Sequence, residues 1–204
     1  MASLRPQFSF SPGTRGPLLR AAPTIVAAWA SAGVFAALAP AMVNGLTGAA
    51  SALLSGLAMF VMAGSGGAAV YLLRGLEPQS SMRVGAAALA LGVTGVVPAL
   101  WLGLLPLFYV AIGLAGTGFG AGFQGAVRSV VASARAHERA GVLSVVFVLA
   151  YLAMGLTAIG AGWLLVHGQD LTATVVEFAA LILALSLVAL LPDTGAARRG
   201  VSST

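Results

Sequence analysis

The chain has 204 residues, of which 59% are hydrophobic and only 7% are charged. A soluble domain carries about 25% charged residues, so this composition predicts an integral membrane protein. There is no cysteine, which excludes disulfides, thiolate metal sites and cysteine nucleophiles. The net charge is +5, but the basic residues stand singly between apolar runs. A nucleic-acid partner is not expected, because nucleic-acid-binding proteins gather such residues on one polar face.

The amino-terminal segment, residues 1–20, is polar and contains three prolines and three arginines. We interpret it as a flexible cytoplasmic arm. A signal peptide is disfavoured, because the apolar run behind it exceeds the roughly 7–15 residues of a signal-peptide core. One transmembrane domain is expected over residues 21–192, followed by a disordered cytoplasmic tail over residues 193–204.

Six apolar runs lie between these two ends. Each is close to the roughly 20 residues that a helix needs to cross a bilayer, and too long for a barrel strand of about 10 residues. The sequence therefore predicts an all-α, polytopic membrane protein with six transmembrane helices in one bundle. The expected helices span about 24–46, 49–73, 84–103, 105–128, 140–166 and 171–192.

The arginines fall in alternate connections between these runs. They are Arg5, Arg15, Arg20, Arg74, Arg83, Arg128, Arg135, Arg139, Arg198 and Arg199. With six crossings, all of them lie on one side of the membrane. The positive-inside rule makes that side the cytoplasm, so both termini are predicted to be cytoplasmic. We expect the membrane to be the bacterial inner (cell) membrane.

The fourth run contains the glycine-rich segment GTGFGAGFQGAVRS, residues 116–129. Three of its glycines have the G-x-G-x-x-G spacing of a dinucleotide-binding turn, but that turn also needs an acidic residue about 20 positions later. The run 140–166 has no Asp or Glu, so we interpret the glycines as sites of close helix packing. At about 100° per residue, two faces are predicted. One holds Gly118, Gly122 and Gly125, and the other holds Gly116 and Gly120.

A polar stripe of Thr117, Gln124 and Arg128 runs between these two glycine faces. Close packing on both sides of a polar strip is typical of a helix that lines a substrate path. The alternative is that Gln124 bonds a neighbouring helix while Arg128 reaches the cytoplasmic headgroups.

The segment GFGAGFQGAVRS, followed by HERAGVLSVVFVLAYLAMGLTAIGAGWLL, resembles the tenth and eleventh helices of major facilitator superfamily transporters. In the second segment, Tyr151 and Gly155 fall where a Tyr-Leu-x-x-Gly-type packing pattern is common in the family. Residues 18–38 are similar to the start of the family's seventh helix. The resemblance extends over residues 15–192. It implies the carboxyl-terminal six-helix half of a twelve-helix transporter, built from two inverted three-helix repeats. The loop RGLEPQSSMR keeps only part of the family's loop signature.

In that family the substrate binds between two six-helix halves, which work by alternating access. The resemblance therefore implies a half-transporter that moves a small molecule, outward and coupled to protons. A second half is required, either a homodimer partner or a separate chain. Because the family's seventh and tenth helices line the cavity, Ser31 and Asn44 join the substrate-path candidates. The alternative is a truncated or non-transporting six-helix fragment that acts only structurally or with a partner half.

The remaining candidates concern chemistry inside the membrane. Glu177 lies seven residues after Asp170 and is the candidate for proton coupling, because charges within a bilayer are costly and usually functional. Its alternative is a carboxylate that reaches outer headgroup water.

His137 and His167 fall in loops on opposite sides, so no metal site is expected. The sequence GSG at residues 64–66 lacks a facing histidine, and we expect no catalytic residue, no cofactor and no enzyme activity.

Overall fold

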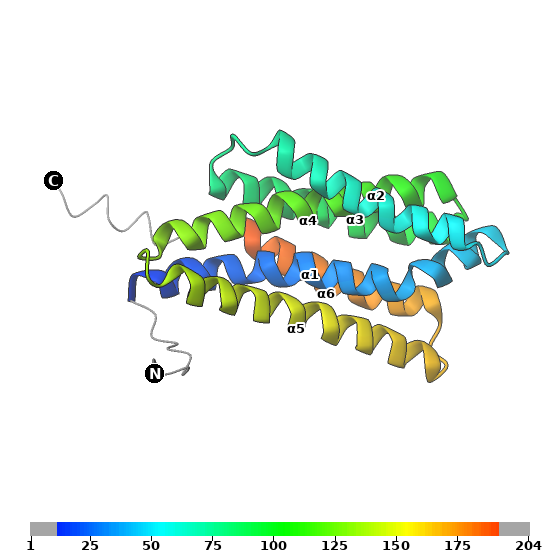
Figure 1. Ribbon diagram of the computed structural model, residues 1–204. Helices are drawn as coiled ribbons and strands as arrows, with labels where there is room; N and C mark the ends of the chain where they lie inside the picture. Colours follow the sequence, from blue (N-terminus) through cyan, green and yellow to red (C-terminus); the bar gives the residue numbers. More distant parts are fainter. Residues whose placement is uncertain (1–11, 192–204) are drawn as a thin grey trace.

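Residues 12–191 are described by the computed structural model, and in that range the chain forms six α-helices and no strand (Figure 1). The helices are α1 (Pro12–Thr47), α2 (Ala52–Leu72), α3 (Pro78–Trp101), α4 (Leu105–Ser133), α5 (Arg139–Val166) and α6 (Leu171–Leu190). All six are long and apolar enough to cross a membrane. The prediction of an all-α fold with six candidate membrane spans is confirmed for the described residues.

The first helix departs most from the prediction. It begins at Pro12, so residues 12–20 are helical, whereas the sequence suggested an arm. Pro17 and Pro23 lie inside the helix, although proline normally interrupts one. The reason is tertiary packing, because Ala21 and Ile25 are fully buried in a cluster with residues of α4 and α5. Residues 1–11 and the predicted tail 193–204 lie outside the described range.

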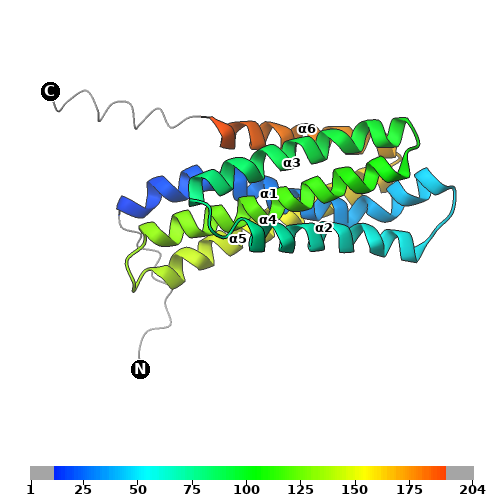
Figure 2. The same ribbon diagram turned by 90° about the horizontal axis from the view of Figure 1, so that it is seen from above.

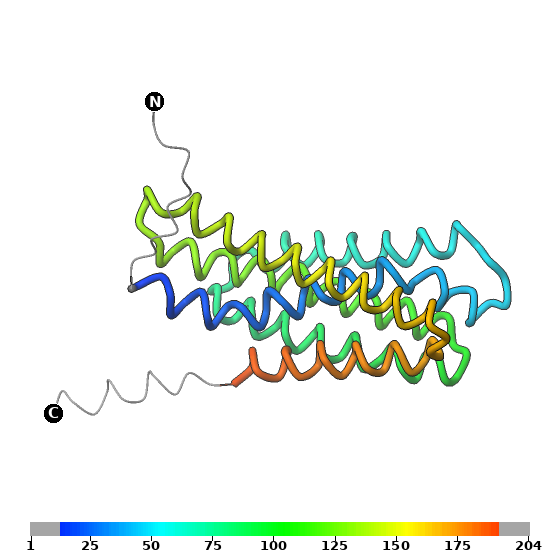
Figure 3. Tube along the Cα trace, turned by 90° about the horizontal axis from the view of Figure 1, so that it is seen from below, coloured from blue at the N-terminus to red at the C-terminus, as the bar shows by residue number. Residues whose placement is uncertain are grey.

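The helices form three groups across the bundle. Figures 2 and 3 show α3 and α6 together on one side, with α1 and α4 in the middle. On the other side, α2 packs on α4 and α5 packs on α1, but α2 and α5 do not touch within the described residues. The bundle therefore has one face where α1 and α4 form a floor between α2 and α5. We call it the α2–α5 face.

Contact between α3 and α4 depends on small residues. A Cβ atom added at Gly85 would overlap the backbone of Gly122, and one added at Gly118 would overlap the backbone of Leu89. A Cβ atom at Gly125 would lie 2.7 Å from the carbonyl oxygen of Pro78. The two backbones thus approach more closely than any larger side chain allows, which is how helices associate in lipid.

The second glycine face of α4 packs on α2. Cβ atoms at Gly116 and Gly120 would overlap the backbone carbonyls of Met62 and Gly66, respectively. Gly155, predicted as a packing glycine, differs, because a Cβ atom there would have no neighbour within 4 Å. Its position on α5 leaves open space where the sequence pattern suggested a close helix contact.

Three hydroxyl groups tie the helices together through backbone carbonyls. Ser81 Oγ donates to the Ala121 carbonyl at 2.8 Å, joining α3 to α4. Tyr109 Oη donates to Leu54 at 2.9 Å and joins α4 to α2. Thr157 Oγ1 of α5 lies 2.8 Å from the Ala153 carbonyl of its own helix and also 3.2 Å from the Ala30 carbonyl of α1. Interhelical hydrogen bonds in membranes contribute on the order of 0.6–2 kcal/mol each, so they support the glycine packing.

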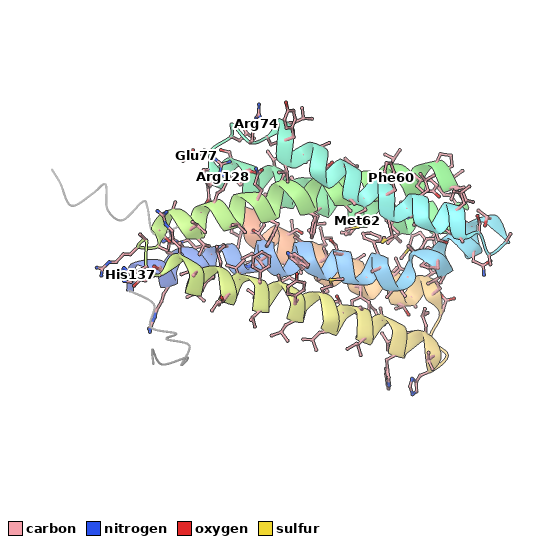
Figure 4. The ribbon with its side chains drawn as sticks, in the orientation of Figure 1. Phe60, Met62, Arg74, Glu77, Arg128 and His137 are labelled. Atoms are coloured by element: carbon pink, nitrogen blue, oxygen red, sulfur yellow. The ribbon has the colours of Figure 1, made fainter. Side chains whose placement is uncertain are left out.

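The connections that carry arginine lie at one end of the bundle. The start of α1, the α2–α3 connection and the α4–α5 connection share this end in Figure 1, and Figure 4 places Arg74, Arg128 and His137 there. At the opposite end, Asp170 caps α6 by accepting a hydrogen bond from the Ala173 amide at 3.0 Å.

The direction of the bundle in the membrane can be measured with single cysteines, because the natural chain has none. Ala136 and Ala50 are exposed at the two opposite ends. If the arginine-bearing end is cytoplasmic, a membrane-impermeant maleimide added to intact cells should label Ala50→Cys and spare Ala136→Cys. Permeabilised cells give the control, where both should react. Labelling of both variants, or of Ala136→Cys alone, in intact cells would refute the predicted topology.

Candidate functional site

A groove of about 560 Å³ lies between α2 and α4 on the α2–α5 face. It begins near the middle of both helices and extends towards the arginine-bearing end. The α2 wall consists of small and apolar residues, and the α4 wall is aromatic and polar. The lining residues that matter here are Ala63, Val70, Phe119, Phe123, Gln124 and Arg128. Ligand pockets typically enclose about 300–1,000 Å³, so the groove has the size of a small-molecule site.

Aromatic rings connect this groove to α5. Trp29 of α1 contacts Phe119 and Phe123 of α4 at ring-centroid distances of 5.5 and 5.4 Å, both edge-on. It also meets Tyr151 of α5 at 5.1 Å, and Phe147 lies 6.0 Å from Phe123. These rings cover the floor formed by α1 and α4. Phe119 and Phe123 therefore line the groove and contact Trp29.

The polar stripe of α4 reaches the end of α2. Gln124 Nε2 donates to the Val70 carbonyl at 3.3 Å, and Arg128 Nη1 donates to the Arg74 carbonyl at 3.1 Å. Val70 lies in the last turn of α2, where backbone carbonyls have no partner inside the helix. The negative end of the helix dipole also favours a nearby cation such as Arg128. Both side chains thus stabilise the carboxyl end of α2.

Some polar atoms beside the groove have no partner. Among the described residues, Gln124 Oε1 and Trp29 Nε1 are buried without a hydrogen bond. The orientation of the Gln124 amide is fixed, because turning it over would place its oxygen against the Val70 carbonyl. A buried polar atom left unpaired costs about 1–3 kcal/mol, so these two atoms favour a ligand or partner that satisfies them.

The other substrate-path candidates do not reach the groove. Thr117 Oγ1 bonds its own helix at the Gly113 carbonyl, 3.0 Å away. Ser31 is fully buried, and its hydroxyl donates to the Ala28 carbonyl at 2.6 Å. Asn44 is exposed near the end of α1, far along the bundle from Arg128. The structure therefore brings together only Gln124 and Arg128 of the predicted set.

Glu177 lies away from the groove. It is exposed on α6, and its carboxylate accepts a hydrogen bond from Gln169 Nε2 at 2.8 Å. His167 lies against the Trp163 ring at 4.1 Å, and His137 is exposed at the opposite end. The part of the chain that the structure describes holds no cluster of three or more His, Asp or Glu residues that could bind a metal.

The sequence did not reveal the ring of Trp29 beside the groove or the α2 wall of the groove. Trp29 sits in an alanine-rich stretch near the start of the predicted helix 24–46, and only the observed start of α1 at Pro12 places it near the middle of a helix. The α2 wall, including Ala63 and Val70, carries no sequence signal, because small and apolar residues occur throughout the chain. Only the packing of α2 on Gly116 and Gly120 places these residues opposite Gln124.

The fold and groove define the class of the protein, namely a six-helix membrane protein with an open groove on one face. Comparison with known proteins adds no family to this class, since no protein-family model, curated protein or solved structure matches the chain.

Proposed function

We propose that the protein moves a small molecule across the membrane by alternating access and acts as one half of a transporter of the major facilitator type. The observation that carries the proposal is the groove itself, which brings Gln124 and Arg128 together with aromatic rings on an uncovered face. A second six-helix half covering the α2–α5 face would close the groove into a cavity between two halves.

The arrangement of the helices supports the same proposal. The resemblance assigns α1 and α4 to the cavity wall, and these two helices form the floor of the α2–α5 face. The last helix, α6, lies on the opposite side of the bundle (Figure 2). Outward transport and proton coupling remain predictions from the resemblance. The groove has no acidic lining residue in the described range, and we assign no coupling role to Glu177.

A non-transporting fragment is the second candidate function, and a specific observation favours it. Gln124 and Arg128 both bond the end of α2, so their polarity is already explained by helix stability. In this case the groove holds lipid, and the protein acts only structurally or with a partner half.

Cysteine accessibility separates the two candidates without knowledge of the substrate. Ala63 is exposed in the middle of α2 and lines the groove. If the groove opens to each side in turn, Ala63→Cys should react with an impermeant maleimide added from either side of the membrane. The measurement uses right-side-out and inside-out vesicles that contain the full chain.

The matched control is Leu181→Cys, which lies at a similar depth in α6 and is 47% exposed. It should react from neither side, because no groove leads to it. Reaction of Ala63→Cys from one side only, or from neither, would favour the non-transporting fragment.

A further inference from the structure

We infer that the groove between α2 and α4 binds a small amphipathic organic anion with a planar apolar body, a negative group and a hydrogen-bond donor. This inference rests on the proposed transport function and names the substrate class of the same site. The three parts of the ligand correspond to three parts of the groove: Arg128 at its mouth, Gln124 one helical turn deeper, and the rings of Phe119 and Phe123.

The charge of the ligand follows from the charges around the groove. Arg128 uses Nη1 for its bond to Arg74, and a guanidinium has five N–H donors, so most remain available. The Arg74 guanidinium lies over the Tyr71 ring, 4.5 Å from its centroid, and Arg74 does not line the groove. Figure 4 shows Glu77 at the same end, but in the described range no carboxylate lies within ion-pair distance of either arginine. An anion in the groove therefore gains the positive charge of Arg128, and no described lining residue is acidic.

We infer the hydrogen-bond donor of the ligand from Gln124. Its amide nitrogen is held by the Val70 carbonyl, so the unpaired Oε1 atom can only accept a hydrogen bond. Gln124 and Arg128 are four residues apart on one helix, or about 6 Å along its axis. A hydroxyl or N–H group at about this distance from the anion satisfies both side chains at once.

The apolar body follows from the groove's size and walls. Phe119 and Phe123 stack at 6.2 Å with an interplanar angle of 20°, so they present adjacent rings. The volume of about 560 Å³ suits a drug-sized molecule, and such pockets are mostly apolar with a few placed polar groups. A soluble organic anion of one or two fused rings fits this description, and we commit to it over a membrane lipid.

The test uses a hydroxynaphthalenesulfonate whose hydroxyl and sulfonate lie on opposite rings. Its permanent charge prevents it from dissolving in the hydrocarbon. The full chain is held in phosphatidylcholine nanodiscs, with Trp101 and Trp163 replaced by Phe so that Trp29 alone reports binding. Both replaced residues are exposed at the end far from the groove, whereas Trp29 touches Phe123. We expect saturable energy transfer from Trp29 to the probe.

Two further ligands measure separately what the hydroxyl group and the sulfonate group of the probe contribute to binding. Naphthalenesulfonate lacks the donor and should bind on the order of fivefold more weakly, since a hydrogen bond contributes about 1 kcal/mol. In Gln124→Leu this difference should vanish. Naphthol lacks the anion and should bind at least about tenfold more weakly, because charged hydrogen bonds contribute about 1.5–3 kcal/mol. Comparison of the three ligands on the unsubstituted groove keeps the test valid even if Gln124→Leu fails to fold.

The matched pair of variants is Arg128→Gln and Arg135→Gln. Arg135 is exposed at the same end but does not line the groove. The first substitution should weaken binding of the hydroxynaphthalenesulfonate by about tenfold or more, and the second should leave it unchanged. Equal losses in both variants, or equal binding of naphthol and the sulfonates, would overturn the inference.

Phosphatidylglycerol tests whether the groove binds a lipid headgroup instead of a soluble anion. If nanodiscs containing this lipid displace the probe, and the displacement requires Arg128, the groove is a lipid headgroup site and the inference of a soluble anion is wrong. Failure of this inference can be distinguished from failure of the proposed function, because labelling of Ala63→Cys needs no ligand. Two-sided labelling without probe binding overturns only the substrate class. Probe binding without two-sided labelling overturns only transport.

Discussion

Gly85→Ala is expected to lower the thermal stability of the protein more than any other alanine substitution proposed here. The new methyl group would overlap the backbone of Gly122, and backbone atoms cannot move aside as a flexible side chain can. The helices α3 and α4 must separate, which also weakens the bond from Ser81 to Ala121. Overpacking usually costs about 1–3 kcal/mol, and a backbone clash lies at the upper end of that range or above it. The measurement is the unfolding midpoint of the detergent-solubilised chain.

Gly155→Ala is the matched control, because it makes the same substitution inside a transmembrane helix but meets no atom within 4 Å. Its midpoint should equal or exceed that of the natural chain, since alanine favours helix by about 1 kcal/mol relative to glycine. Equal destabilisation by the two substitutions would show that the close approach of α3 and α4 contributes nothing specific.

Gln124→Leu is expected to reduce transport to background while membrane insertion stays normal. The substitution removes the unpaired acceptor Oε1 and the donor that holds the Val70 carbonyl, and it leaves an apolar side chain of similar size. Uptake of the hydroxynaphthalenesulfonate into proteoliposomes measures the effect. A loss of at least about tenfold corresponds to about 1.4 kcal/mol of lost stabilisation.

Thr94→Val serves as the control for that experiment. Thr94 is exposed on α3, and its hydroxyl bonds only the Ala90 and Leu91 carbonyls of its own helix. Uptake of the hydroxynaphthalenesulfonate by the Thr94→Val variant should match uptake by the natural chain. If Gln124→Leu also transports normally, Gln124 serves only to hold α2, and the non-transporting alternative gains support.

Most of the fold is encoded locally and could be predicted. Apolar runs and alternating arginines are properties of single segments, and they give the six helices in order. The 100° spacing also separates Gly118 and Gly122 from Gly116 and Gly120, and the structure places the first pair against α3 and the second against α2. Which helix meets which face depends on contacts between distant segments, and the sequence pattern does not contain that information.

The start of α1 shows the same division between local and distant effects. Pro17 and Pro23 locally indicate an interrupted, non-helical arm. The helix persists because Ala21 and Ile25 pack on Val130 and Val146, more than 100 residues later in the chain. No local pattern reports that burial.

The candidate site could be predicted only in part. Gln124 and Arg128 stand out as polar residues in an apolar run, so their importance is visible in the sequence. Their partners are the backbone carbonyls of Val70 and Arg74, which every residue type carries and which no sequence pattern marks. The groove likewise exists because α2 and α5 do not meet, a property of the assembled bundle.

The short connection between α3 and α4 affects how the protein is made. Only Leu102–Leu104 separate these two helices, and Gly85, Gly118 and Gly122 let them pack along their length. The pair can leave the insertion machinery as one hairpin as soon as α4 is synthesised. Helix α1 packs most extensively on α5, which is synthesised about 100 residues later. We therefore expect the second hairpin to assemble early in synthesis, whereas α1 completes its packing only after α5 has been made.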